Sequence, residues 1–495
     1  MSEIKPDELY DSLVSYGMFS EKLPSIFTGD LFLNYCKNIC KQSFSDEWRG
    51  YINYESMRNI NIPRNIGIPT PMGHELLCKT LMKHWTELIK YFETKTKGQS
   101  RIISRIHIRK MQDTKAIFLM NYKNWIDDGT PEPEIYLGKR YMIHTDISKC
   151  YPSIYTHAIP WALVGKDIAK NNIGKYKEWY NQIDHFAQIS KNGETHGLLI
   201  GPHTSNILSE IILCAIDKEL SKKYDSYIRN IDDYICYVDT KEEADNFIID
   251  LNRELRKYDL LMNHKKTEIY ELPICVVETW IHKIQNHIVT FQKFKNYIDY
   301  REIQAFIDFI IKLVSENTDN NSVILYAVKV LKNFTLTKNA QEYLVKSIVS
   351  LSLLYPYLVP ILGQYIFEKY NVDTNQIQKY ANMIYEKYIQ KNNYEACSFA
   401  LLYAIDSNSK IDSIDVEIIK NSQDCILMLM AFIYCKKNNL KSEIKQLKLY
   451  AKELEKKGEI DQYWLFVYEC LGKLTGEWGT MKKNKVSFLK SEYRF

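Results

Sequence analysis

The sequence predicts an α+β fold over residues 1–299, followed by an all-α array of HEAT-like helical repeats over residues 300–495. In the first part, short runs of β-branched and aromatic residues alternate with helical patterns. After about residue 300 the strand signals nearly vanish, and helical patterns follow one another with short polar breaks such as residues 317–322. Helix pairs of this kind usually stack into a solenoid, although no sharp repeat period is visible.

Length and composition favour a multidomain protein of the cytoplasm. At 495 residues the chain exceeds what one hydrophobic core usually supports. It has no uncharged apolar run of about 18 residues and no basic-then-apolar start, so we expect neither membrane insertion nor export. The 11 cysteines form no C-x-x-C pair, which predicts reduced thiols and no structural zinc. A net charge of +4 leaves any nucleic-acid contact to local basic surface.

The chain is expected to be mostly helical up to about residue 95, interrupted by an ordered loop at the Pro/Gly cluster of residues 61–73. Residues 101–110 then alternate with a period of two, which predicts a strand. Its basic face carries Arg101, Arg105, His107 and Arg109, and its apolar face carries Ile102, Ile106 and Ile108. The local sequence favours a solvated edge strand. The alternative is a phosphate-binding strand, because guanidinium groups make bidentate contacts with phosphate oxygens.

The centre of the chain is organised around Asp146. The apolar approach at residues 141–145 predicts a buried strand that ends at this carboxylate. Pro152 suits the first position of the next helix, because its missing N–H would be unpaired there. An aromatic-rich helical segment extends from there to about residue 191. Taken alone, Asp146 would be a cap or turn residue.

Two further features follow in order. Residues 192–202 are rich in turn-forming residues and lead into a buried helix that Thr204 or Ser205 is expected to cap. Residues 226–239 contain two short β-prone runs, which predict a hairpin with Asp232 and Asp233 at its tight turn. An amphipathic helix over residues 241–258 and the stretch 260–270 complete this region.

Together these pieces resemble the palm of reverse transcriptases over roughly residues 60–280. Residues 146–151 (Asp-Ile-Ser-Lys-Cys-Tyr) resemble the first catalytic motif and residues 197–217 the second. Residues 230–233 (Asn-Ile-Asp-Asp) resemble the third motif and residues 261–267 (Leu-Met-Asn-His-Lys-Lys-Thr) the fourth. Each motif is weak by itself, but four in order at workable spacings make coincidence improbable. The resemblance implies a palm and fingers in the first part of the chain.

The resemblance also implies nucleotidyl transfer with two Mg²⁺ ions, or Mn²⁺ in their place, which activate the attacking oxygen and stabilise the leaving one. Asp146 and Asp232 would be the bridging ligands, Asp233 a supporting carboxylate and the Ile147 carbonyl an extra ligand. Lys266 would protonate the leaving pyrophosphate as a general acid. An exposed lysine on a turn is an equally good interpretation of Lys266.

Nucleotide binding is assigned by the same resemblance. Arg101, Arg105 and Arg109 become candidates for the incoming triphosphate, because the family places basic finger residues just before the palm. Tyr151 follows the first catalytic aspartate by five residues, where reverse transcriptases carry an aromatic ring that crowds the 2′-position of the sugar. Deoxynucleoside triphosphates are therefore the expected substrates, and Gly201 of the second motif is expected to line their site.

Two departures argue against ordinary templated copying. Reverse transcriptases commonly have Leu-Pro-Gln-Gly in the second motif, whereas residues 198–201 are Leu-Leu-Ile-Gly and lack the glutamine near the nascent base pair. Asn230 stands where an aromatic residue normally precedes x-Asp-Asp. No clear thumb motif, maturase-like segment or Cys/His endonuclease cluster follows the palm, which argues against group II intron enzymes.

A palm joined directly to helical repeats is similar to the abortive-infection (Abi) polymerases, bacterial and prophage-borne proteins that defend against phage. That family implies template-independent DNA synthesis primed by a tyrosine hydroxyl of the protein, single-stranded DNA attached to the chain, and homo-oligomers. The phage or host trigger is not visible in the sequence. Among the 37 tyrosines, Tyr10 near the N-terminus is the first candidate primer and Tyr16 the second, the alternative being that Tyr10 only anchors the first helix.

Two other functions stay open. One is an RNA-templated reverse transcriptase with the same fold. The other is a catalytically idle palm that serves as a protein-binding scaffold. The retention of Asp146, Asp232 and Asp233 counts against the scaffold, because it has no need for carboxylates that repel one another.

Overall fold

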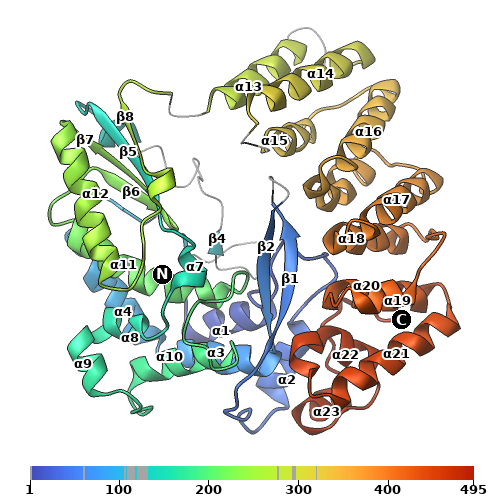
Figure 1. Cartoon of the computed structure of the whole chain (residues 1–495), viewed down its shortest axis with the longest axis horizontal. Coiled ribbons are helices and arrows are strands. Elements are labelled where there is room, and N and C mark those ends of the chain that lie inside the picture. Colours follow the sequence, from blue (N-terminus) through green and yellow to red (C-terminus); the bar gives the residue numbers. More distant parts are fainter. Residues whose placement is uncertain are drawn as a thin grey trace.

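The computed structural model describes residues 3–58, 62–104, 107–108, 118–119, 132–275, 278–292, 297–318, 320 and 322–495. Figure 1 shows an α/β part at one side of the molecule and a curved array of helices at the other. The array begins above the α/β part and descends to the lower right, where it meets the first segments of the chain. The predicted α+β class, with a helical C-terminal region, is confirmed.

The N-terminal region combines helices with a hairpin that the sequence did not predict. Strand β1 (Tyr51–Met57) pairs antiparallel with β2 (Pro63–Pro69), so the ordered loop expected at residues 61–73 is wrong. The two prolines lie at the ends of β2, opposite Met57 and Tyr51, where a missing N–H disturbs the ladder least. The helices of this region are α1 (Pro6–Ser15), α2 (Asp30–Asn38), α3 (Pro71–Lys83) and α4 (Trp85–Thr96).

The central sheet has four antiparallel strands in the order β6-β7-β5-β8. They are β5 (Tyr141–Asp146), β6 (Tyr227–Asn230), β7 (Asp233–Val238) and β8 (Glu268–Glu271). Helix α11 (His203–Leu220) and helix α12 (Lys241–Arg256) lie beside this sheet (Figure 1). The strand predicted to end at Asp146 is confirmed, and so is the amphipathic helix expected over residues 241–258.

Between β5 and β6 the predicted helical segment is broken into short helices: α7 (Cys150–Ser153), α8 (Ala158–Val164), α9 (Lys166–Asn171) and α10 (Trp179–Ile189). Pro152 is the third residue of α7 rather than the first, a position whose N–H also lacks an intrahelical partner. Helix α11 starts at His203 without a Thr204 or Ser205 cap. The His203 N–H instead donates to the Gly17 carbonyl at 2.8 Å, which satisfies one of the free amides of the helix end.

The basic stretch at residues 101–110 is described only in part. Strand β3 (His107–Ile108) pairs with β4 (Phe118–Leu119), and helix α6 (Glu132–Ile135) follows. Arg105, Ile106 and Arg109 lie outside the described residues. The expected alternation of basic and apolar faces is wrong at the start of this stretch. Ile102, predicted on the apolar face, is 70% exposed, whereas Ile103 is buried against the core. The Ile103 carbonyl accepts from the Arg229 N–H, so contact with the edge of β6 decides which isoleucine turns inward.

The C-terminal region is a succession of helices, and among its described residues five of them begin at a side-chain cap. The side chains of Asp299, Asp373, Asn393, Asp415 and Asp424 accept hydrogen bonds from the first turns of the helices they precede. The helices are α13 (Thr279–Gln292), α14 (Tyr300–Glu316), α15 (Ser322–Leu331), α16 (Lys338–Ser352), η2 (Pro356–Ile361), η3 (Gly363–Phe367), α17 (Thr374–Ile389), α18 (Tyr394–Asp406), α19 (Val416–Asn421), α20 (Cys425–Lys437), α21 (Lys441–Lys456), η4 (Ile460–Tyr463), α22 (Trp464–Cys470), α23 (Gly476–Lys483) and η5 (Ser491–Tyr493), besides η1 (His264–Lys266) in the α/β part. No helix within the described ranges has the length and apolar character needed to cross a membrane.

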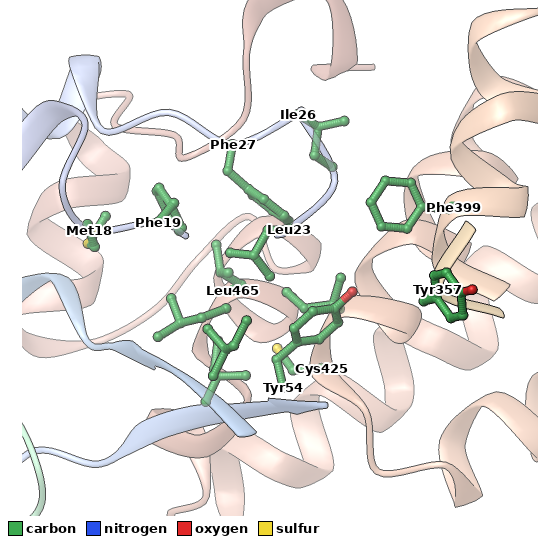
Figure 2. Packing of buried hydrophobic residues seen from close by; sticks show 14 of the residues in the cluster. Met18, Phe19, Leu23, Ile26, Phe27, Tyr54, Tyr357, Phe399, Cys425 and Leu465 are labelled. Atoms are coloured by element: carbon green, nitrogen blue, oxygen red, sulfur yellow. The ribbon is translucent and has the colours of Figure 1, made fainter. Parts of the chain in front are cut away.

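The end of the helical array packs onto the beginning of the chain. Figure 2 shows Leu23 and Phe27, Tyr54 of β1, and Cys425 and Leu465 of the array in one buried cluster. Polar contacts accompany this packing: Glu395 accepts hydrogen bonds from the Ser56 hydroxyl and the Met57 N–H, each at 2.7 Å. Arg49 pairs with Glu477 at 2.5 Å. The two parts therefore share a core, while a domain boundary between residues 299 and 300 stays a prediction.

Candidate active site

Three aspartates meet at one end of the central sheet. Asp146 is the last residue of β5 and lies directly opposite Asp233, the first residue of β7. Asp232 lies beside them in the two-residue turn between β6 and β7. The Ile147 N–H donates to the Asp232 carbonyl at 3.2 Å, which ties the turn to the end of β5. The hairpin is as predicted, but Asp233 already belongs to a strand, because register pairs it with Asn230.

The fourth predicted motif packs against the first. The Asn263 N–H donates to the Asp146 carbonyl, and the Ser148 N–H donates to the Leu261 carbonyl, each at 2.8 Å. These backbone bonds bring Lys266 to the site, where its Nζ lies 2.5 Å from Oδ2 of Asp146. The Lys266 side chain is 64% exposed, so its ammonium group reaches the carboxylate from the solvent side. Motifs that are separate in the sequence thus meet at one site.

The site concentrates negative charge in a partly dry environment. Burial, followed by the neighbouring Asp233 and Asp146 carboxylates, raises the pKa of Asp232 to about 6. Burial also raises the pKa of Asp233, and His144 opposes that change. The hydrogen bond to Asp146 raises the pKa of Lys266. A second cation near these carboxylates would therefore stabilise their ionised forms.

The donor set fits a divalent metal ion. Oδ1 of Asp146 is buried and accepts no hydrogen bond from any residue that the structure describes. An unpaired buried carboxylate oxygen is costly, and a cation would satisfy it. Carboxylate oxygens are also the ligands that Mg²⁺ prefers in proteins. Across the described ranges, however, no three His, Cys, Asp or Glu side chains already stand close enough to hold one ion, so the ligand set of Asp146, Ile147, Asp232 and Asp233 stays a prediction.

Tyr151, the predicted sugar gate, ends the first motif and contacts the second. The Tyr151 hydroxyl donates to Oδ1 of Asn206 in α11 at 2.7 Å, and burial raises the pKa of Tyr151. The Tyr151 carbonyl accepts from the Leu198 N–H at 2.8 Å. These contacts fix the ring relative to the loop that precedes α11. A rigidly held ring is what a steric gate requires.

The loop of the second motif packs against the β1–β2 hairpin. Gly201 has φ +128°, and a Cβ there would lie 2.9 Å from Cγ2 of Ile66 in β2. The Gly67 N–H donates to the Ile200 carbonyl at 2.9 Å, and Leu199 lies against Gly67. The hairpin missed by sequence reasoning thus supports the loop. A nucleotide-binding role for Gly201 and Arg101 stays a prediction, and Arg105 and Arg109 lie outside the described residues.

The two candidate primers are held in place by hydrogen bonds. Tyr10 is buried in α1, and its hydroxyl donates to Oε1 of Glu75 at 2.8 Å. Burial strongly raises the pKa of Tyr10. These contacts favour the alternative stated for Tyr10, in which the residue anchors the first helix. The hydroxyl of the half-buried Tyr16 donates to Glu21 at 3.0 Å, and burial raises its pKa to about 12.

Sequence reasoning also missed a buried charged cluster behind the hairpin turn. Arg229 of β6 is fully buried and pairs with Glu210 and Asp217, which lie two turns apart in α11. The available signal was a pair of acidic residues seven positions apart within an apolar helix stripe, preceding an arginine three residues before Asp232. A buried carboxylate pair of this kind demands a cationic partner.

The comparison with protein families identifies this part of the chain. The family model described as reverse transcriptase (RNA-dependent DNA polymerase) matches residues 94–293. Residues 94–293 are therefore similar to a reverse-transcriptase domain. The match covers the central sheet, both aspartate-bearing elements and Lys266, so the chain carries a polymerase domain of the nucleotidyltransferase kind. Polymerases with this domain generally use divalent metal ions and act on nucleotides and nucleic acid.

Two solved telomerase structures are also similar to the chain. An apo telomerase from Candida tropicalis matches with 14% identity and a TM-score of 0.31, covering 77% of this chain and 68% of that one. A telomerase from Candida albicans, in complex with a TWJ fragment of telomeric RNA, matches with 11% identity and a TM-score of 0.30. This match covers 85% of this chain and 70% of the telomerase chain. No curated protein sequence matches.

Proposed function

We propose that the reverse-transcriptase domain makes DNA by Mg²⁺-dependent nucleotidyl transfer at Asp146, Asp232 and Asp233. The observation that carries this proposal is the register of Asp146 opposite Asp233, with the buried, unpaired Oδ1 of Asp146 beside them. Bound Mg²⁺ supplies positive charge to the attacking oxygen and to the leaving pyrophosphate in such polymerases. The role of the three carboxylates is to hold that charge at the end of β5.

The other residues of the site act on the substrate. Lys266 would give a proton to the leaving pyrophosphate, because its Nζ already lies beside Asp146. Tyr151 can exclude the 2′-hydroxyl of a ribonucleotide, since its ring is fixed by Asn206. Arg101 would bind the triphosphate through its guanidinium group, and its segment contacts the central sheet at the Ser104–Arg229 bridge.

Template-independent synthesis is the favoured mode. The loop that holds the nascent base pair in templated enzymes carries only apolar side chains here, and Leu199 is turned against Gly67 of the β1–β2 hairpin. A glutamine that would contact the base pair is absent from residues 198–201. An RNA-templated reverse transcriptase is the alternative within the same fold. An idle palm that only binds proteins is disfavoured, because it gains nothing from an unpaired buried carboxylate oxygen.

The biological part of the proposal is defence against phage by abortive infection, in the manner of the Abi polymerases. It is supported by the direct succession of palm and helical array, since α13 and α14 are the next elements after β8 in the described part of the chain. We further propose priming by a tyrosine hydroxyl, a covalently attached single-stranded product and assembly into homo-oligomers. Tyr16 is now the better of the two named primer candidates, because the Tyr10 hydroxyl is buried against Glu75.

The test is an incorporation assay without template or primer. Purified protein is incubated with each deoxynucleotide or ribonucleotide in turn and with Mg²⁺ or Mn²⁺, and Asp232→Asn serves as the matched inactive variant. We expect deoxynucleotide incorporation by the wild type and none by Asp232→Asn, with the same circular dichroism spectrum for both. Incorporation only after addition of RNA template would support the templated alternative. Equal incorporation by both proteins would refute the site.

Priming is tested on the product of the same reaction. The protein is denatured in detergent, digested with nuclease and protease, and searched by mass spectrometry for a tyrosine that carries a nucleotide. A nucleotide on Tyr16 would support the assignment, whereas one on another tyrosine would keep protein priming and reject Tyr16. DNA that separates freely from the denatured chain would reject protein priming itself.

A further inference from the structure

The buried cluster of Arg229, Glu210 and Asp217, here called the Arg229 cluster, lies directly behind the turn that carries Asp232. All three side chains are almost completely buried, with exposures of 0%, 1% and 2%. Ion pairs at this depth are expensive to desolvate and add little net stability. Their presence next to a candidate catalytic turn therefore calls for a role other than stability alone.

The guanidinium group of Arg229 uses every donor it has. It donates to Oδ2 of Asp217 from Nε at 2.9 Å and from Nη2 at 2.7 Å. It also donates to both carboxylate oxygens of Glu210 at 3.1 Å. The last donor, on Nη1, reaches the Ile231 carbonyl at 2.8 Å. Because an arginine has five N–H donors, four are spent on fixing the group to α11 and one on holding the turn.

The residue that receives this last hydrogen bond is conformationally unfavourable. Ile231 has φ +57°, a left-handed conformation that β-branched residues rarely adopt. Such a backbone persists only where its surroundings over-determine it. The next residue is Asp232, whose carbonyl accepts from the Ile147 N–H at the end of β5. Releasing the Ile231 carbonyl would let the turn relax and move Asp232.

We propose that the Arg229 cluster positions Asp232 by clamping the Ile231 carbonyl, so that the hairpin turn holds Asp232 at the end of β5 before any metal ion binds. This inference rests on the proposed function of the Asp146–Asp232 site. Arg229 acts through the backbone and touches no substrate, which makes it a positioning residue. A lysine in its place retains the charge but has only three donors and no fork, so it cannot satisfy both carboxylates and the carbonyl.

The experiment measures Mn²⁺ binding by isothermal titration, together with hydrogen exchange of the peptide spanning residues 227–238. Four proteins are compared: wild type, Arg229→Lys, Asp232→Asn and Arg49→Lys. Arg49→Lys is the matched control, because it makes the same change at a largely buried arginine that pairs with Glu477 far from the aspartates in sequence. We expect Arg229→Lys to weaken Mn²⁺ binding by roughly 10- to 100-fold, the range seen when partners that orient metal ligands are removed. It should also speed hydrogen exchange in the hairpin, whereas Arg49→Lys should leave both unchanged.

The outcomes separate the two proposals. Mn²⁺ binding that is lost in Asp232→Asn but unchanged in Arg229→Lys would overturn the positioning role and leave the site intact. Mn²⁺ binding unchanged in Asp232→Asn would overturn the site itself, and the positioning role with it. If Arg229→Lys does not fold, Glu210→Gln decides in its place, because it keeps one acceptor for the guanidinium. Weaker Mn²⁺ binding and faster hairpin exchange in Glu210→Gln support the clamp, and wild-type values overturn it.

Discussion

Replacing Glu395 with glutamine is expected to remove a pH-dependent loss of stability where the helical array meets β1. Glu395 is 3% exposed, and its carboxylate accepts hydrogen bonds from the Ser56 hydroxyl and the Met57 N–H. Burial raises the pKa of Glu395 from 4.5 to about 7. A glutamine retains the shape, can accept from the Met57 N–H and can donate to the Ser56 hydroxyl.

The sign and size of the change in unfolding free energy with pH follow from the linkage between protonation and folding. Because the pKa of Glu395 in the folded protein lies above its unfolded value, the protonated side chain favours the folded state. That contribution is fully present below about pH 4.5 and is lost as the pH rises through about 7. At about 1.4 kcal/mol for each pH unit between the two values, the loss amounts to about 3 kcal/mol above pH 8, as an upper bound. Glutamine cannot ionise, so the variant should escape this loss.

The assay is urea unfolding of the wild type and of Glu395→Gln at pH 5 and pH 8.5. The difference between the two proteins isolates Glu395 from other buried carboxylates that titrate nearby in pH, such as Asp424, whose pKa burial raises to about 6. We expect the variant to gain up to about 3 kcal/mol relative to wild type on going from pH 5 to pH 8.5. The same difference at both pH values would refute the reasoning, and with it the buried contact between β1 and α18.

Three further predictions concern the site and the shared core. Tyr151→Val should raise the use of ribonucleotides relative to deoxynucleotides in a competition assay, because it removes the ring held by Asn206; unchanged selectivity would place the gate elsewhere. Gly201→Ala should lower the free energy of unfolding by about 1–3 kcal/mol, since φ is +128° and the new Cβ would meet Ile66; an unaffected urea midpoint would contradict this. Removal of residues 300–495 should yield aggregates in size-exclusion chromatography, because β1 and β2 lose the contacts made by Glu395 and Trp464; a soluble, active monomer would count against the shared core.

Several features of this protein were readable from the sequence because the signals are local. An apolar run that ends in Asp146 and two β-prone runs around Asp232 are short-range patterns, and the strands form where these patterns lie. The same holds for the C-terminal helices, since capping residues such as Asp373 and Asp424 act within one helical turn. The order of the motifs then limited the topologies that could bring the aspartates together.

Only the tertiary structure determined the features that depend on contacts between segments distant in the sequence. The β1–β2 hairpin formed despite its prolines because its residues pair with each other and pack on the helical array, a contact no local pattern encodes. Tyr10 became an anchor because α3 presents Glu75 to it, and Ile103 rather than Ile102 turned inward because β6 meets its carbonyl. Arg229, Glu210 and Asp217 are individually ordinary residues, and only the packing of β6 on α11 makes them a buried cluster. In each case the free energy comes from burial and pairing between distant segments, which propensity and periodicity do not measure.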